Sequence, residues 1–248
     1  MGQLHYPLSE NFLRYFDVAF AGTRTLKEDA YRIRYSVYCE EFQYEPGESF
    51  PNRQETDAFD QYSLHALVTH KSTGLPAGCV RLVSPAESDG SDLLPFENHC
   101  ADSLDNAFVD NLAIDRTSIC EISRLAVDSA FRRRAGEQIT RYGEVDGLDC
   151  TQQERRTFSI IAVACFLAAT ALTDISRRTN VFAMMEPFLP RLLRRSGIEF
   201  QRAGADIDYH GLRAPYFITT ESAVNNMRAD LKELYQEIYK SVSRDFSP

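Results

Sequence analysis

The stretch ICEISRLAV at residues 119–127 decides the fold, because the elements predicted on either side are organised around this strand. A hairpin precedes it, with predicted strands SLHALVT at 63–69 and AGCVRLVS at 77–84. The uncharged segment TFSIIAVACFLAATALT at 157–173 follows as a predicted helix buried in the core, and NVFAMM at 180–185 is the next strand. This mixed order predicts an α/β protein with a single twisted, mostly antiparallel sheet and helices on both faces.

The outer segments are predicted to add further helices and two short strands. Amphipathic helices are expected at 10–21 and 26–42, with Thr25 as the cap of the second. Beyond the strand NVFAMM, the pattern predicts a short helix that ends in glycine, two strands and a closing helix, at 187–197, 198–201, 214–219 and 221–242. No stretch resembles a linker, so we expect a single domain over residues 1–248.

Composition and charge argue against several functional classes. The net charge of −9 predicts no general affinity for nucleic acid. The apolar segment at 157–173 is shorter than the roughly 20 residues that a membrane span needs, so we expect no span. The N-terminus lacks the apolar core of a secretory signal, and the six cysteines include no C-x-x-C pair. Both features are typical of a cytoplasmic protein with reduced thiols.

Four short patterns occur in a fixed order in the first half of the chain. They are RYSVY at 34–38 followed by Tyr44, ETDAFD at 55–60, the strand arginine Arg81, and EISR at 121–124. In order and spacing they resemble the acyl-homoserine-lactone synthase family. The resemblance implies the GNAT fold of acyl-CoA N-acyltransferases, in which two central strands splay apart, and it implies acyl transfer to an amine.

Three phrases mark the second half: MEP at 185–187, LLRR at 192–195 and HGLRAPY at 210–216. They are similar to phrases in the bacterial acyltransferases associated with PEP-CTERM and exosortase systems. Tyr38 and Tyr44 stand where the lactone synthases have Phe and Trp in their S-adenosylmethionine pocket. This departure favours a different acceptor. The N-acyl amino acid synthases of similar fold imply an amino acid or a related small amine.

Acyl transfer from a thioester to an amine has three requirements. A base removes a proton from the amine, hydrogen-bond donors stabilise the carbonyl oxygen, and the protein holds the two reactants together. Glu121 and Ser123 are two residues apart on the predicted strand 119–127, so their side chains should share one face. Glu121 is the candidate base for the amine proton, with Ser123 beside it in the catalytic site. Alternatively, Glu121 forms a buried ion pair with Arg81 or Arg124. Strand alternation predicts Arg124 on the opposite face.

The acceptor pocket is predicted to come from the N-terminal third of the chain. Asp57 and Asp60 are candidates to bind the ammonium group of the acceptor, or else they cap a turn. Arg34 is a candidate to grip a carboxylate with its two-pronged guanidinium, and the alternative is a surface ion pair with Glu40 or Glu41. With the residues that the resemblance adds, the predicted substrate-binding set is Arg34, Tyr38, Tyr44, Asp57, Asp60, Arg81 and Arg124.

Arginine is concentrated in the second half of this acidic chain. Because guanidinium groups suit phosphates and acidic surfaces, these arginines predict docking of an acidic acyl carrier protein. Its phosphopantetheine thioester would enter between strands 119–127 and 180–185. The alternative is that the arginines lie on solvated helix faces and pair with nearby glutamates. The predicted donor site comprises loop arginines and the start of the apolar helix, namely Arg132, Arg133, Arg134, Thr157 and Ser159.

The sequence therefore predicts an N-acyltransferase that moves a fatty acyl group from acyl carrier protein, or alternatively from acyl-coenzyme A, to a small amine. We expect no tightly bound cofactor and, since the histidines show no ligand spacing, no metal. Tyr209 and Tyr216 are candidate acids for the departing thiolate, or else core residues. Two rival hypotheses are a coenzyme A-dependent GNAT enzyme that modifies a protein or polyamine, and a non-catalytic acyl-binding regulatory module.

Overall fold

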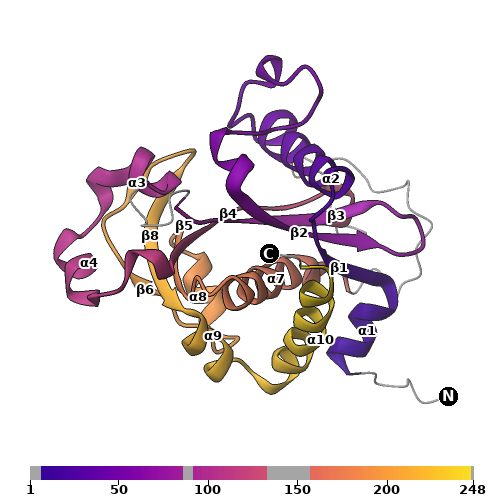
Figure 1. Ribbon diagram of the computed structural model, residues 1–248. Helices are drawn as coiled ribbons and strands as arrows, with labels where there is room; N and C mark the ends of the chain where they lie inside the picture. The colour runs from indigo at the N-terminus through magenta and orange to yellow at the C-terminus, as the bar shows by residue number, and fades with distance from the viewer. Residues whose placement is uncertain (1–6, 86–91, 133–156, 247–248) are drawn as a thin grey trace.

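Figure 1 shows the computed structural model, which describes residues 7–85, 92–132 and 157–246. Its strands are β1 (Phe16–Phe20), β2 (Ser63–His70), β3 (Pro76–Val83), β4 (Ile119–Val127), β5 (Asn180–Met185), β6 (Gln201–Arg202), β7 (Ile207–Asp208) and β8 (Leu212–Thr219). They form one mixed sheet in the order β1-β2-β3-β4-β5-β8-β6, with β7 paired to β8. Within the described residues, β4 and β5 are the only parallel neighbours. The predicted sheet is thereby confirmed.

Helices cover both faces of the sheet, as predicted. They are α1 (Leu8–Tyr15), α2 (Arg24–Arg34), α3 (Pro95–Cys100), α4 (Asn106–Leu112), α5 (Ser129–Arg132), α7 (Ile161–Ile175), α8 (Leu189–Arg194), α9 (Thr220–Asn226) and α10 (Ala229–Asp245). In Figure 1, α2 lies on one face of the sheet, and α7 and α10 lie on the other. No helix in the described ranges is both long enough and apolar enough to cross a membrane.

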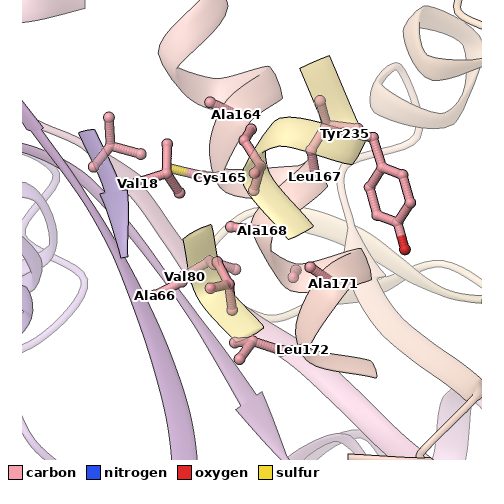
Figure 2. Packing of buried hydrophobic residues seen from close by; sticks show 14 of the residues in the cluster. Val18, Ala66, Val80, Ala164, Cys165, Leu167, Ala168, Ala171, Leu172 and Tyr235 are labelled. Atoms are coloured by element: carbon pink, nitrogen blue, oxygen red, sulfur yellow. The ribbon is translucent and has the colours of Figure 1, made fainter. Parts of the chain in front are cut away.

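Small residues let α7 pack closely against the sheet. Ala164 and Ala168 are completely buried on this helix, which contacts β2, β3 and α10 (Figure 2). On the sheet side, Gly78 of β3 makes room for the helix. A Cβ atom at this position would lie 2.8 Å from Cys165 Sγ and 2.9 Å from Ile161 Cγ2. The helix and the central strands are therefore held at a fixed close distance.

The opposite face of the sheet is covered by α2. A hydrophobic cluster joins Ala30 and Ile33 of this helix to Leu67, Cys79 and Ala126 of the three strands below. The helix then continues as a π-helix over Tyr35–Glu41. This face carries the N-terminal candidate residues, because α2 and the segment after it lie against β3 and β4.

Two predicted boundaries near the N-terminus are wrong for local reasons. Residues 16–20 form β1 rather than the end of the predicted helix 10–21, because alternate apolar side chains are buried there at strand spacing. The cap of α2 is Thr23 and not Thr25. The Thr23 side chain accepts a hydrogen bond from the Leu26 amide at 3.3 Å, which starts the helix earlier than predicted.

The C-terminal part also differs from the prediction. The expected helix 221–242 is two helices, α9 and α10, because Met227 between them has an extended backbone and is buried in the core. The expected strand 198–201 is reduced to β6. The short helix α8 is followed by Gly197 with φ of +82°, which confirms the predicted glycine stop.

β4 and β5 pair over only a short stretch. Their parallel register begins at Ile119 with Asn180 and ends at Glu121 with Phe182. Both strands continue beyond this point, but they no longer pair with each other. The predicted splay of the central strands therefore begins at Glu121.

Candidate active site

Arg34 lies on the sheet-facing side of α2 and is completely buried. Its Nε donates to Glu55 Oε2, and its Nη1 and Nη2 donate to the two oxygens of Asp60 at 2.6 and 2.9 Å. The predicted alternative, a surface ion pair with Glu40 or Glu41, is wrong because this side of the helix faces the sheet. Two protein carboxylates hold the guanidinium, so a substrate carboxylate would have to compete with them.

Arg81 of β3 joins the same cluster. Its Nη1 donates to Asp57 Oδ1 at 2.6 Å and to Asp60 Oδ1 at 3.0 Å, and its Nε donates to Ser123 Oγ at 3.2 Å. Arg81 and Ser123 are partners in the register of β3 and β4, which brings the two side chains together. In the described structure, the Nη2 atom of Arg81 is buried without a partner. A free N–H donor therefore lies next to Ser123.

Arg124 shares the Asp57 carboxylate with Arg81, so the prediction that it points to the opposite face is wrong. Its φ of +52° lies in the left-handed region, where the register between β3 and β4 shifts. A β-bulge of this kind interrupts strand alternation and re-aims a side chain. Arg124 Nη2 consequently lies 3.2 Å from Glu55 Oε1 and 3.3 Å from Asp57 Oδ2.

Asp57 and Asp60 also cap the turn that carries them. Asp57 Oδ1 accepts a hydrogen bond from the Phe59 amide at 2.9 Å, and Asp60 Oδ2 accepts one from the Asp57 amide at 2.8 Å. The capping alternative is confirmed, although both carboxylates bind arginines as well. Burial alone would raise the pKa of Asp60, but hydrogen bonds and charge from Arg34, with the charge of Arg81, hold that pKa well below its usual range.

The ionic cluster is balanced in charge. At its centre it contains as many cations as anions, namely Arg34, Arg81 and Arg124 against Glu55, Asp57 and Asp60, and Glu45 Oε1 lies at its edge, 3.8 Å from Arg124 Nη2. Glu121 is an additional carboxyl group, three residues before Arg124 on β4. Among the described residues, no cation lies within ion-pair distance of it, so the predicted alternative of an ion pair with an arginine is not formed.

Glu121 is only 3% exposed. Its Oε2 accepts a hydrogen bond from the Phe96 amide of α3 at 2.8 Å. Burial raises the pKa of Glu121 to about 7, although the Phe96 amide and the charges of Arg81 and Arg124 act in the opposite direction. The carboxyl group beside the splay therefore titrates near neutral pH.

Tyr38 and Tyr44 form an aromatic wall next to this cluster. The Tyr38 hydroxyl donates to the Leu125 carbonyl of β4 at 3.0 Å, and its ring lies under the Arg124 guanidinium at 5.6 Å. Tyr44 stacks on Tyr38 with ring centroids 6.2 Å apart. The hydrogen bond ties the wall to the part of β4 that has separated from β5. The two tyrosines are thus held beside the ionic cluster, and their role in substrate binding stays a prediction.

The turn between β7 and β8 completes the wall with residues that the sequence did not single out as site residues. His210 packs on Tyr44 at 5.3 Å between ring centroids, and its Nε2 lies 3.6 Å from Glu45 Oε1. Arg213 places its guanidinium carbon 5.8 Å from the Tyr44 ring centre. Both belong to the phrase HGLRAPY, whose glycine marks a turn, but no spacing in the sequence connects this turn to Tyr44.

The two candidate tyrosine acids have different surroundings. Tyr216 is 6% exposed and packs in a hydrophobic cluster, which confirms the core alternative for it. Tyr209 is half-buried, and its ring stacks on His99 of α3 with centroids 5.8 Å apart. Burial raises the pKa of Tyr209, so its hydroxyl stays protonated at neutral pH. It remains a candidate proton donor at the edge of the site.

Of the predicted donor residues, Arg132 has partners outside the ionic cluster. Arg132 Nε donates to the Val127 carbonyl at 2.7 Å, and its Nη2 pairs with Glu41. Thr157 is buried, and α7 begins only after a 3₁₀ turn at Phe158–Ile160, later than predicted. Ser159 in this turn is exposed. The remaining two donor candidates, Arg133 and Arg134, lie outside the described residues.

A cavity of about 760 Å³ opens elsewhere, at the start of β5 and the end of β8, and Asn180, Thr220 and Tyr235 contribute to its lining. It includes neither Glu121 nor the ionic cluster. The splay itself is defined by the loss of backbone pairing. The Phe96 and Phe182 rings stack with centroids 5.0 Å apart, and both residues are neighbours of Glu121, through the Phe96 amide and through the register of β4 and β5.

Residues 33–141 match the family model described as "Acetyltransferase (GNAT) domain". This range contains all of the ionic cluster and Glu121. No curated protein matches the chain in sequence. The match confirms the predicted domain type and enzyme class.

Several solved structures share the fold. TofI, solved in a ternary complex with an inhibitor and MTA, is 18% identical, with 89% of this chain and 99% of TofI covered and a TM-score of 0.59. MesI, a CoA-dependent acyl-homoserine lactone synthase, is 17% identical over 91% and 95% of the two chains, with a TM-score of 0.55. FeeM, an N-acyl amino acid synthase from uncultured soil microbes, is 13% identical over 86% and 94%, with a TM-score of 0.54. The predicted fold is confirmed.

Proposed function

Because the chain carries a GNAT-type acetyltransferase domain, we propose that this acyltransferase moves a fatty acyl group from an acyl carrier protein thioester to the amine of a small acceptor, an amino acid or a related compound. The activities named for MesI and FeeM, lactone synthesis and N-acyl amino acid synthesis, are both acyl transfers to a small amine. Their shared fold with this chain supports the reaction class.

The observation that carries the proposal is the position and the pKa of Glu121. Its carboxyl group lies where the pairing of β4 and β5 ends, and burial brings its pKa to about 7. A base with a pKa near the working pH is the most effective acceptor of a proton at that pH. Since Arg81 and Arg124 form their ion pairs with other carboxylates, Glu121 is free to take up and release a proton.

In the proposed reaction, the neutral amine attacks the thioester carbonyl carbon, and a C–N bond forms. The nitrogen loses one proton to the Glu121 carboxylate. The C–S bond then breaks, and the leaving thiolate takes the proton from Glu121, which returns the carboxylate to its starting state. The free Nη2 hydrogens of Arg81 are assigned to a substrate oxygen on which negative charge develops.

The splayed strands suit the donor. Beyond Glu121, the facing edges of β4 and β5 do not pair with each other, so their backbone groups are available to the amides of a pantetheine arm. The arm would run along this edge and bring its thioester to Glu121. Tyr38 and Tyr44 would hold the acceptor on the other side of the carboxyl group.

The surface of α8 supports a carrier protein as the donor. This helix follows β5 directly, and Arg191 and Arg195 are exposed on it with no ion-pair partner among the described residues. Phe188 and Leu192 are 59% and 52% exposed beside them. An apolar patch flanked by arginines is complementary to a small acidic carrier protein. Arg133 and Arg134 stay part of the proposed donor site.

We further propose that the protein acts in the bacterial cytoplasm as one domain over residues 1–248. The described cysteines are all free and buried, which suits a reducing compartment. The sheet takes strands from both ends of the chain, which supports a single domain. A role connected with PEP-CTERM and exosortase systems is supported by the sequence resemblance of the second half.

Mass spectrometry of the reaction products tests this function. The purified protein is incubated with a mixture of amino acids and polyamines, with either acyl carrier protein or coenzyme A carrying the same acyl group. An N-acyl amino acid formed with the carrier protein is the expected result. Product formed with acyl-coenzyme A alone would mean that coenzyme A, and not the carrier protein, is the donor. Acylation of a polyamine alone would mean that the acceptor is a polyamine and not an amino acid. Acyl binding without any product would contradict the reaction.

Matched variants test the residues. Glu121→Gln is expected to lower kcat/KM roughly 100- to 10,000-fold by removing the base, whereas Glu28→Gln on the exposed side of α2 should have no effect. Arg191→Glu and Arg195→Glu should raise KM for the acyl carrier protein but not for a free acyl-pantetheine thioester. Arg24→Glu, which is also exposed, is the control for this charge reversal.

A further inference from the structure

Arg213 differs from the arginines of the ionic cluster. Arg34, Arg81 and Arg124 each bind carboxylates of the protein. In the described structure, Arg213 has no carboxylate within ion-pair distance, and its Nε is buried without a hydrogen-bond partner. A buried guanidinium donor without an anion is costly, so it calls for an anionic partner that the protein itself does not supply.

The surroundings of Arg213 place this donor next to the aromatic wall. The guanidinium lies over Tyr44, and Tyr44 in turn stacks on Tyr38 and packs on His210. His210 is not a competing cation, because burial lowers its pKa below the ordinary value even though Glu45 opposes this. Arg213 is therefore the available positive charge on this side of the wall.

The charge of Arg213 reaches α3, the helix that also binds the proposed base. The pKa of the buried Cys100 thiol of α3 is raised by burial and by the charge of Glu121, while Arg213 acts on it in the opposite direction. The Phe96 amide of the same helix donates to Glu121. An acceptor lying along the aromatic wall would meet the guanidinium at Tyr44.

We propose that Arg213 binds a carboxylate of the acceptor, so that the enzyme selects amines that also carry a carboxylate group. This inference rests on the proposed function and narrows its acceptor class. The free Nε and a terminal nitrogen of the guanidinium can hold both oxygens of one carboxylate. A phosphate of the donor has the same chemistry, but Arg213 lies over Tyr44, which belongs to the proposed acceptor wall, and this favours the acceptor.

A competition assay tests the proposal. The wild-type protein, Arg213→Gln and Arg213→Lys are each given the acyl donor with a mixture of L-amino acids and an equal mixture of their carboxamides, and the products are compared by mass spectrometry. Wild type should favour the acids. Arg213→Gln should lower the ratio of acid to amide products roughly 10- to 100-fold, as expected for the loss of a hydrogen bond to a charged group. Arg213→Lys should keep part of the preference.

Arg202→Gln is the matched control, since Arg202 is exposed on neighbouring β6 and already pairs with Asp206 at 2.5 Å. Its product ratio should equal that of wild type. Thermal unfolding of all variants identifies any change that comes from misfolding. An unchanged ratio in a folded Arg213→Gln protein, or a rise in KM for the acyl donor alone, would overturn the proposal, and the second result would assign Arg213 to a donor phosphate.

Failure of the proposed function itself gives a different result. In that case wild type forms no product from either mixture, and binding is measured without turnover by saturation-transfer NMR on the same two mixtures. Binding of the acids that is lost in Arg213→Gln would support the carboxylate site without the reaction. Equal signals for the wild type and Arg213→Gln would refute the site.

Discussion

The buried state of Glu121 predicts a specific dependence of stability on pH. Burial raises the pKa of this group from its ordinary 4.5 to about 7 in the folded protein. The folded state therefore holds the proton more tightly than the unfolded state. The resulting stabilisation is fully present below pH 4.5 and is lost as the pH rises through about 7. The difference between the two pKa values, multiplied by ~1.36 kcal/mol, corresponds to about 3 kcal/mol.

The substitution Glu121→Gln isolates this contribution. A glutamine oxygen can still accept the hydrogen bond from the Phe96 amide, but the side chain no longer titrates. Urea unfolding of both proteins is measured at a series of pH values between 4 and 9, and the free energies of unfolding are subtracted. All other titrating groups cancel in the difference. Relative to wild type, the variant should gain about 3 kcal/mol between the acid and the alkaline end, with the change spread over the interval from about pH 4.5 to about pH 7.

A flat difference curve would refute the reasoning, because Glu121 would then titrate alike in the folded and unfolded states. A change of the opposite sign, in which the variant loses stability relative to wild type as the pH rises through about 4, would do so as well, since it would mean that a cation stabilises the carboxylate in the folded protein.

Further predictions concern the residues that hold the site in place. Asp60→Ala should lower the free energy of unfolding by about 3–5 kcal/mol in urea, because it leaves two buried arginines without a shared carboxylate. The control Asp206→Ala, at an exposed site, should lower it by less than about 1 kcal/mol. Equal losses in the two variants would contradict the role of the cluster. Gly78→Val should cost about 1–3 kcal/mol by forcing α7 from the sheet, and an unchanged melting temperature would show that the contact with Cys165 is loose. Tyr38→Phe should cost about 1 kcal/mol through the lost hydrogen bond to β4, measured against wild type in urea.

The central part of the fold was predictable because its signals are local. The strands at 119–127 and 180–185 are found with the predicted bounds, since each is a compact apolar run between turn residues. The helix 10–21 was overextended because a short amphipathic helix runs directly into a strand with no glycine or proline between them. At such a junction, the period of the buried residues changes within one turn, and a window of helical length averages over the change.

The candidate site was predictable only in part. The motif residues Arg34, Asp57, Asp60 and Arg81 were predicted as one substrate-binding set, but their mutual pairing depends on tertiary contacts that link α2 to β3. The orientation of Arg124 was missed because strand alternation fails at a residue with positive φ, which no glycine announces in the sequence.

The sequence pattern did not predict that residues of the C-terminal half contribute to the aromatic wall. His210 and Arg213 come to Tyr44 from a turn far along the chain, and such long-range contacts leave no periodic signal. The glycine after His210 marks the turn, but only the pairing of β7 with β8 brings this turn to the aromatic wall.

A crystal structure with a non-hydrolysable acyl-pantetheine analogue tests the central claim most directly. The pantetheine amides are expected along the edges of β4 and β5 beyond Glu121, with the acyl carbonyl within hydrogen-bond reach of the space beside this carboxyl group. An analogue bound elsewhere, with β4 and β5 paired along their whole length, would contradict the account.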